Sequence, residues 1–204
     1  MMSLLEFYER FRPKSYATNW HHRLLCEQLE KAYTLHENLV IEAPPRHAKS
    51  EITNMYAPAW RYLTDPDEHV GLICNSDSLA KKFSVGTRNI VLSPEYQKLA
   101  KYKLEIDRDA EWKIKTSRKE IDFSFKGAGV RGQITGHGFS VLIFDDLLKN
   151  GQEAKSDTVR NNIWDNVVSA ALNRLTPDGI VIALQARFHQ DDVIGKLLAT
   201  EEVL

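Results

Sequence analysis

Cysteine is scarce in this chain, and long apolar runs are missing. Only Cys26 and Cys74 occur among the 204 residues, and their spacing matches neither a disulfide framework nor a zinc site. The longest apolar runs, such as Val141–Phe144, have the length of a strand and are too short to span a bilayer. The first residues also lack the basic and apolar regions of a secretory signal. We therefore expect a protein of a reducing cytoplasm with no membrane partner.

An excess of charge of either sign is missing as well. The 27 basic and 28 acidic residues nearly cancel, which leaves a net charge of −1. A module that covers DNA statically is usually basic overall, so any contact with DNA is expected to be local or transient. Apolar residues make up 43% and charged residues 27%, the balance of an ordinary globular domain. The length fits one domain, and we expect residues 1–204 to form it.

Short apolar runs alternate with helix-like segments, which is the pattern of an α/β domain. Residues 1–36 are predicted to be mostly helical and amphipathic, and residues 37–204 to form the sheet-containing core. Strands are predicted at Leu39–Ile41, Val70–Cys74, Val141–Phe144 and Ile180–Leu184, and a hairpin over 112–126, where Trp112, Ile114, Ile121, Phe123 and Phe125 alternate. Strands separated by helices predict a mostly parallel sheet covered on both faces.

Local signals also predict where several helices begin. A helix is expected after Lys49, with Pro58 kinking or shortening it. The run Asn75-Ser76-Asp77 is suited to cap a helix that begins near Leu79, and Asp191 is suited to start the last helix. Five of the ten glycines fall between Gly127 and Gly138, just ahead of a buried strand.

A candidate phosphate-binding loop joins the first predicted strand to the next helix. Its sequence is Ala43-Pro44-Pro45-Arg46-His47-Ala48-Lys49-Ser50. Backbone N–H groups at a helix N-terminus bind phosphate, while Lys49 would reach the β- and γ-phosphates of ATP and Ser50 would bind Mg²⁺. Ala43 and Ala48 stand where the Walker A pattern has glycine. The alternative is a polar loop whose Lys-Ser pair merely opens a helix.

A second motif, of the Walker B type, supplies carboxylates at the end of a buried strand. Val141–Phe144 is followed directly by Asp145 and Asp146. Ligands of open α/β sheets bind at the carboxyl ends of the strands. Asp145 is expected to hold Mg²⁺, directly or through water, and Asp146 to polarise the attacking water. The alternative is a strand that ends in a solvated acidic turn, but the two motifs together are more specific than either alone.

With these residues in place, the chain resembles the ATPase half of phage terminase large subunits, from Trp20 to Leu198. The motifs that carry the resemblance are, in chain order, Trp20-His21-His22, Pro44-Pro45-Arg46-His47 with Lys49-Ser50-Glu51, Pro58-Ala59-Trp60, Thr135-Gly136, Asp145-Asp146 with Lys149-Asn150, Glu153-Ala154 with Ser156, Arg174-Leu175, and Arg187-Phe188-His189 with Asp191-Asp192 and Gly195. The resemblance implies a P-loop NTPase fold of the RecA/ASCE type. It also implies Mg-dependent ATP hydrolysis that moves viral double-stranded DNA into a procapsid.

The same resemblance implies partners and a location. These are double-stranded DNA, further copies of the chain in a ring on the portal, the portal protein and the small terminase subunit, in the host cytoplasm. Full terminase large subunits carry a C-terminal nuclease. We expect that domain, and nuclease activity, to be absent from this chain, because no further acidic cluster follows the last motor motif.

Several further roles follow from the resemblance. The loop residues Pro45, Arg46, His47 and Ala48 are expected to surround the phosphates, with Arg46 as an arginine acting within its own subunit. Arg131 resembles a position that in some terminases reaches the nucleotide of the neighbouring subunit. For either arginine, the alternative is a structural salt bridge or a solvated loop residue.

The adenine side and the γ-phosphate sensor are assigned in the same way. Trp20 is expected to stack on adenine, with His21 in a slot often held by Gln; a Trp20 packed in the core is the alternative. The chain departs from the family in having Asp145-Asp146 where many terminases have Asp-Glu, and Ala186 where a hydroxyl residue is common. Gln185 is therefore the substitute candidate for the sensor of the γ-phosphate.

Three other functions remain open at this stage. A superfamily-two helicase-like ATPase shares the Lys loop and the acidic strand, but normally needs a second RecA-like domain. A P-loop kinase would pass phosphate to an acceptor other than water. A nucleotide-binding scaffold without catalysis would explain the missing glycines. Phosphate release that depends on Lys49 and Asp146 separates the motor from the scaffold.

Overall fold

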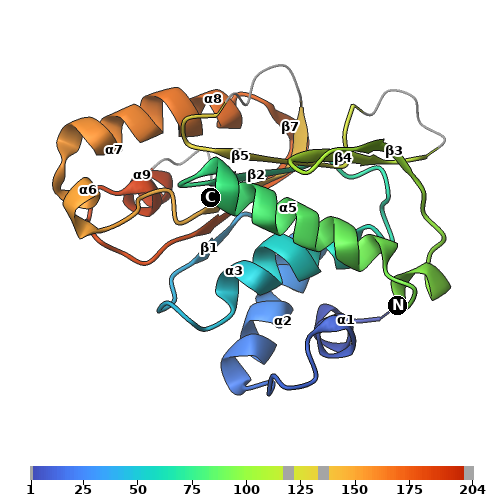
Figure 1. Cartoon of the computed structure of the whole chain (residues 1–204). Helices are drawn as coiled ribbons and strands as arrows, with labels where there is room; N and C mark the ends of the chain where they lie inside the picture. The colour runs from blue at the N-terminus through green and yellow to red at the C-terminus, as the bar shows by residue number, and fades with distance from the viewer. Residues whose placement is uncertain (1, 117–121, 133–137, 200–204) are drawn as a thin grey trace.

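The computed structural model describes residues 2–116, 122–132 and 138–199, and its centre is a seven-stranded sheet in the order β1-β7-β6-β2-β5-β4-β3 (Figure 1). The strands are β1 (Leu39–Ile41), β2 (Val70–Cys74), β3 (Leu104–Asp107), β4 (Glu111–Ile114), β5 (Phe125–Gly129), β6 (Phe139–Asp145) and β7 (Leu175–Leu184). From β1 to β5 in this order all neighbours are parallel, whereas β4 pairs antiparallel with both β5 and β3. The predicted α/β fold with a mostly parallel sheet is confirmed.

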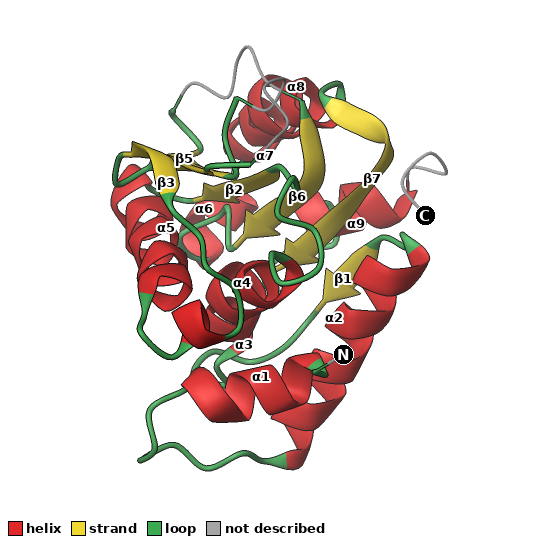
Figure 2. Cartoon of the chain, turned by 90° about the vertical axis from the view of Figure 1, so that its right-hand side faces the viewer, coloured by secondary structure: helices red, strands yellow, loops and turns green. Residues whose placement is uncertain are grey.

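Helices cover both faces of this sheet (Figure 2). They are α1 (Leu4–Phe11), α2 (Trp20–Leu35), α3 (Lys49–Glu51), α4 (Ala57–Arg61), α5 (Asp77–Leu92), α6 (Gly151–Lys155), α7 (Asp157–Ile163), α8 (Ser169–Leu172) and α9 (Val193–Ala199). Short π-helical segments lie at Ile52–Tyr56 and Trp164–Val168, and a 3-10 turn at Tyr96–Lys98. Among the described residues, no helix has both the length and the apolar character needed to cross a bilayer.

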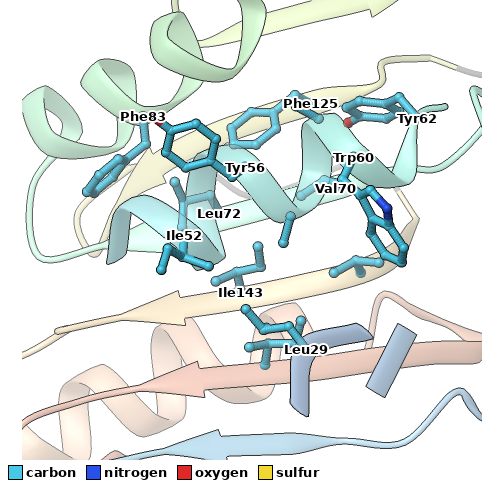
Figure 3. Close-up of a cluster of buried hydrophobic side chains, with 14 of the residues drawn as sticks. Leu29, Ile52, Tyr56, Trp60, Tyr62, Val70, Leu72, Phe83, Phe125 and Ile143 are labelled. Carbon is cyan, nitrogen blue, oxygen red and sulfur yellow. The ribbon is translucent and has the colours of Figure 1, made fainter. Parts of the chain in front are cut away.

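The alternation of side chains along the strands divides the core into two layers. In β6, Val141 and Ile143 belong to the cluster that packs against α1, α2, α4 and α5, whereas Leu142 and Phe144 face α6 to α9. Figure 3 shows part of the first layer, where Ile143 lies near aromatic and aliphatic side chains of the neighbouring helices and strands. A strand that is buried on both faces explains the continuous apolar run in the sequence.

The predicted hairpin over 112–126 is correct only in part. Trp112 and Phe125 are partners in the antiparallel pair β4–β5, but Phe123 is a buried loop residue and Ile121 lies outside the described residues. β5 then continues through Gly129 as a parallel partner of β2. The first glycines of the glycine-rich stretch therefore belong to a strand rather than to a loop.

Gly129 also explains why α5 begins earlier than predicted. The Oδ1 atom of Asp77 accepts the backbone N–H of Gly129 at 2.7 Å, and a Cβ on Gly129 would lie 2.5 Å from the Asp77 nitrogen. The helix starts at Asp77 instead of near Leu79, and its N-cap residue, Ser76, makes no side-chain capping bond. The contact between strand and helix determines this boundary.

Two other helix predictions need correction. Pro58 lies in the first turn of α4 and follows a π-helical turn, in which the N–H of Ala57 donates to the carbonyl of Ile52. The wider turn accommodates the missing N–H of the proline without a break. The last helix begins at Val193, and Asp192 rather than Asp191 caps it by accepting the N–H of Gly195 at 3.0 Å.

Candidate functional site

The site forms where the parallel strands end side by side. Ile41, Leu184, Asp145 and Cys74 are aligned across β1, β7, β6 and β2. The residues that follow them in the chain therefore share the carboxyl edge of the sheet, where ligands of such folds bind. β7 lies between the strand that leads into the 43–50 loop and the strand that ends in Asp145.

The 43–50 loop adopts a backbone conformation that favours glycine at two positions. Arg46 and Ala48 have positive φ values of 65° and 56°. The left-handed region costs an L-residue roughly 1–2 kcal/mol, so the surroundings must hold Ala48 there. α3 then starts at Lys49, whose side chain is buried. The loop thus has a strained turn at the place of the missing glycine.

The basic and acidic motifs, far apart in the sequence, meet at this edge. The Nζ atom of Lys49 lies 2.9 Å from Oδ2 of Asp146, and the hydroxyl of Ser50 donates to Oδ1 of Asp145 at 3.0 Å. Asp145 is 1% exposed. The sequence separations are 97 and 95 residues, so only the folded sheet brings these groups together. The structure therefore places Lys49 beside Asp146, the carboxylate predicted to polarise the attacking water, and Ser50 beside Asp145, the predicted metal ligand.

Sequence reasoning missed Asn54, which completes this cluster. Asn54 is fully buried, and its amide donates to Oδ2 of Asp145 at 2.6 Å. Ser50 and Asn54 are four residues apart on the helix after the loop, so both reach the same carboxylate. The sequence signal that could have identified Asn54 is an asparagine four residues after the loop serine, Ser50.

Burial gives Asp145 the character of a cation ligand. Burial first, and then the charge of Asp146, raise the pKa of Asp145 to about 6, against the opposing effects of Asn54, Lys49 and Ser50. The negative charge of the Asp145 carboxylate is only partly compensated by its protein partners, so the site favours binding of a further cation. Carboxylate and hydroxyl oxygens are ligands that suit Mg²⁺.

The donor set also fits the way in which Mg²⁺ is usually held. Among the described residues there is no group of three or more His, Cys, Asp and Glu side chains that could hold a metal ion by themselves. Mg²⁺ commonly uses one or two protein ligands and completes its coordination with water and phosphate oxygens. Ser50 and Asp145 are thus an adequate protein contribution to a metal–nucleotide site.

Gln185 lies in the middle of this edge. It is 1% exposed, and its backbone N–H donates to the carbonyl of Ile41 at 3.2 Å, which ties the end of β7 to the end of β1. Its amide nitrogen is buried and has no hydrogen-bond partner among the described residues. Such a group costs free energy unless a ligand or water satisfies it. Gln185 is not among the residues that line the cleft of the 43–50 loop, and its role as a sensor of the γ-phosphate stays a prediction.

A cleft of ≈ 830 Å³ opens in front of the loop. Pro45, Arg46, His47, Ala48, Lys49 and Ser50 line it together with Asp146, and Tyr8, Tyr16, His21, His22 and Lys82 line its other parts. The loop residues from Pro45 to Ser50 therefore lie at one cleft, whereas Ala43 and Pro44 line a neighbouring groove. The Arg46 side chain is exposed at this cleft.

Trp20 does not take the place that was expected. Its side chain is 74% exposed, so packing in the core is excluded, and it lines a neighbouring groove with Leu24 and Pro44. His21 lines both the groove and the cleft. Tyr8, Tyr16 and Phe83 also line the cleft, and sequence reasoning missed all three. Stacking of Trp20 on adenine stays a prediction without support from its position.

Arg131 lies apart from the cleft within one chain. It is exposed and lines a smaller cleft of ≈ 360 Å³ with Asn75, Lys149 and Glu153, beside the ends of β2 and β5. The adjoining Thr135-Gly136 motif lies outside the described residues. An action of Arg131 on the nucleotide of its own chain finds no support in this position.

Among solved structures, the chain is similar to the large terminase of bacteriophage HK97. The match has a TM-score of 0.62 at 12% identity and covers 96% of this chain and 40% of that one. The chain has a large-terminase fold. At this identity the similarity shows the fold alone, and the chain spans 40% of the length of the HK97 terminase.

Two further phage proteins match this chain with lower TM-scores. The ATPase domain of the Thermus phage P74-26 large terminase gives a TM-score of 0.43 at 10% identity, covering 74% of this chain and 59% of that one. The N-terminal domain of the DNA packaging ATPase from bacteriophage phi29 gives 0.39 at 12% identity, covering 80% and 78%. Comparisons with models of protein families and with curated proteins find no match.

Proposed function

We propose that this chain is the ATPase domain of a terminase large subunit and hydrolyses the γ-phosphate of ATP with Mg²⁺. One observation carries the proposal: Lys49, Ser50 and Asp146 line one cleft, and the buried Asp145 lies directly behind Ser50, from whose hydroxyl it accepts a hydrogen bond. Lysine beside a hydroxyl, facing a buried carboxylate at a parallel strand end, is the arrangement that phosphoryl transfer requires. The large-terminase fold supports the same proposal.

In the proposed reaction, the residues of the site act mainly by position and charge. Lys49 exchanges its contact with Asp146 for phosphate oxygens, which leaves the Asp146 carboxylate to orient the attacking water and accept its proton. Ser50 and Asp145 would hold Mg²⁺, which would supply positive charge to the phosphates. Arg46 and Gln185 contact the γ-phosphate, where charge develops in the transition state.

We also propose that this hydrolysis moves double-stranded DNA into a procapsid. The working form is then a ring of copies of this chain on the portal, with the portal protein and the small terminase subunit as partners in the host cytoplasm. The near-zero net charge agrees with local and transient contacts to DNA. The likeness to a phage large terminase is the support for these partners.

Phosphate release from ATP tests the enzymatic part directly. We expect Mg-dependent release by the purified chain, with and without double-stranded DNA, and its loss in Lys49→Ala and Asp146→Asn. Lys14→Ala and Asp178→Asn make the same chemical changes at exposed positions and should keep the wild-type rate. ATP binding should fall in Lys49→Ala and persist in Asp146→Asn. Of these two side chains, the lysine contacts the phosphates of bound ATP, whereas the aspartate acts on the attacking water.

The same assay separates the other functions. A scaffold binds ATP without releasing phosphate, a kinase places labelled phosphate on an acceptor other than water, and a helicase separates DNA strands. ATP binding with no phosphate release under any condition, including in the assembled motor, would rule out the proposed hydrolysis.

A further inference from the structure

Asp146 has an uncommon backbone conformation at the end of β6. Its φ is 44°, in the left-handed region. For most L-residues this region costs roughly 1–2 kcal/mol; aspartate enters it more readily, because its short polar side chain can hydrogen-bond locally, and the surrounding contacts select it here. The direction of the Asp146 carboxylate toward Lys49 depends on this backbone conformation. The contacts that enforce it are therefore part of the catalytic arrangement.

Hydrogen bonds reach Asp146 from both neighbouring strands. On the β7 side, its N–H donates to the carbonyl of Leu184 at 2.9 Å, and its Oδ1 accepts the N–H of Ala186 at 3.1 Å. On the β2 side, the amide of Asn75 donates to the main-chain carbonyl of Asp146 at 3.1 Å. Asn75 follows Cys74 directly, as Asp146 follows Asp145, and Cys74 and Asp145 are partners in the sheet.

We propose that Asn75 is a positioning residue for hydrolysis. Its amide holds the carbonyl of Asp146 and thereby fixes the carboxylate in the direction needed to orient the attacking water. Asn75 itself does not line the cleft of the 43–50 loop, but lies at the separate cleft with Arg131. This inference rests on the proposed function, since it assigns a part in the same reaction.

The position of Asn75 allows its hydrogen bond to be removed without disturbing the hydrophobic core. Its side chain is partly exposed at the end of a strand and belongs to neither core cluster. Removing its amide therefore opens no core cavity. A variant of Asn75 is expected to fold, so that a loss of activity reports on the hydrogen bond rather than on unfolding.

The test compares Asn75→Ala, Asn75→Asp and Asn75→Gln with wild type in ATP hydrolysis and ATP binding. We expect kcat to fall by about tenfold to a hundredfold in the alanine and aspartate variants, which lack the donor, because small misplacements of a catalytic group have effects of this size. KM and the Kd for ATP should change less than about twofold, since Asn75 does not line the cleft that binds ATP and acts through a carboxylate needed only in the transition state. Asn75→Gln keeps an amide donor and should retain more of kcat than either.

The control is Asn173→Ala, the same substitution at an exposed residue after α8. It should leave kcat unchanged, and thermal unfolding should show that every variant is folded. Wild-type kcat in folded Asn75→Ala and Asn75→Asp would overturn the inference, as would a loss confined to KM. If the alanine variant does not fold, the aspartate and glutamine variants decide the same question. A wild-type chain that does not hydrolyse ATP would instead refute the proposed function.

Discussion

At the scale of single residues, the site departs from ordinary backbone and charge preferences at a few positions. Ala48 occupies a left-handed turn, and Asp145 is buried with a raised pKa. A second buried carboxylate, Glu68, lies away from the site; it is 7% exposed and accepts from Nε of Arg61 at 2.7 Å. Each departure has a measurable consequence, because strain and desolvation both change the free energy of unfolding.

Replacing Ala48 by glycine should relieve the strain in the loop. We expect Ala48→Gly to raise the free energy of unfolding by about 0.5–1 kcal/mol, since the gain from removing the left-handed penalty exceeds the entropy that glycine adds to the unfolded chain. ATP binding should be kept or improved. Chemical denaturation measures the first, and a nucleotide-binding titration the second.

The matched control is Ala43→Gly, because Ala43 does not share the positive φ of Ala48. Ala43→Gly should lower the free energy of unfolding, because glycine adds entropy to the unfolded chain and relieves no strain at this position. Equal losses in the two variants would show that the turn at Ala48 is not strained.

Glu68 predicts a pH dependence of stability whose sign can be worked out. Burial raises the pKa of Glu68 from 4.5 to about 6, although Arg61 opposes the shift. The folded state therefore binds the proton more tightly than the unfolded state. The stability that this group contributes is present below pH 4.5 and is lost as the pH rises through about 6.

The variant Glu68→Gln cannot titrate and should lack this loss. We expect its free energy of unfolding to rise relative to wild type by about 1–2 kcal/mol between pH 4.5 and pH 7, whatever the offset at one pH. Denaturation curves at several pH values measure the difference. A difference that stays constant, or that changes in the opposite direction, would contradict the raised pKa.

At the scale of elements, most strands and their order of appearance were predictable from apolar runs. Leu39–Ile41 and Val70–Cys74 were predicted with their observed bounds, because a short run of apolar residues is a local property of the chain. The first residues of α5 and α9 were not predicted correctly. Asp77 in α5 accepts a hydrogen bond from Gly129 of β5, and Asp192 caps α9. Contacts between elements decided those ends.

Two adjacent lysines of helix α5, Lys81 and Lys82, lie in different surroundings. Nζ of Lys81 lies 2.7 Å from Asp109, whereas Lys82 lines the cleft of the 43–50 loop and has no ion pair among the described residues. The Lys82 ammonium lies 5.9 Å from the centre of the Phe83 ring, an aromatic contact that leaves its charge uncompensated. A free cation at this cleft favours a polyanionic ligand.

We therefore expect Lys82→Ala to weaken ATP binding by about threefold to tenfold, the effect of one partly screened charge. Lys81→Ala should leave the Kd for ATP unchanged, although it makes the same substitution one residue away. Titration at low and high salt should show the Lys82 effect shrinking as ionic strength rises. Equal effects of the two variants would contradict the assignment.

At the scale of the whole molecule, the position of Arg131 bears on how copies work together. In one chain, Arg131 faces a cleft of its own beside the ends of β2 and β5. The 43–50 cleft contains Arg46 as its own arginine. If the proposed motor needs Arg131 for hydrolysis, the residue must act on a neighbouring copy, since a ring places one subunit's surface against the next.

Mixing two inactive variants tests this arrangement. Lys49→Ala retains Arg131 but lacks a working nucleotide site, whereas Arg131→Ala has the site and lacks the arginine. Under conditions in which the ring assembles, each alone should show little hydrolysis, and an equal mixture should recover part of the wild-type rate. Recovery should be absent when Arg131→Ala is mixed with the double variant Lys49→Ala/Arg131→Ala, because a working site is then present but no chain supplies the arginine.

An Arg131→Ala chain with full activity would remove Arg131 from the reaction altogether. Loss of activity without recovery on mixing, in rings shown to contain both variants, would argue for a role within one chain.

The sequence by itself determined the strand–loop–helix around Lys49 and Ser50, the acidic strand end at Asp145 and Asp146, and the α/β class of the fold. These depend on residues that are neighbours in the chain, so local patterns suffice. Tertiary structure alone decided that Asn54 and Asn75 join the two aspartates and that Trp20 faces a separate groove. The physical reason is that sheet order pairs segments about a hundred residues apart, and no local pattern specifies which strand ends become neighbours.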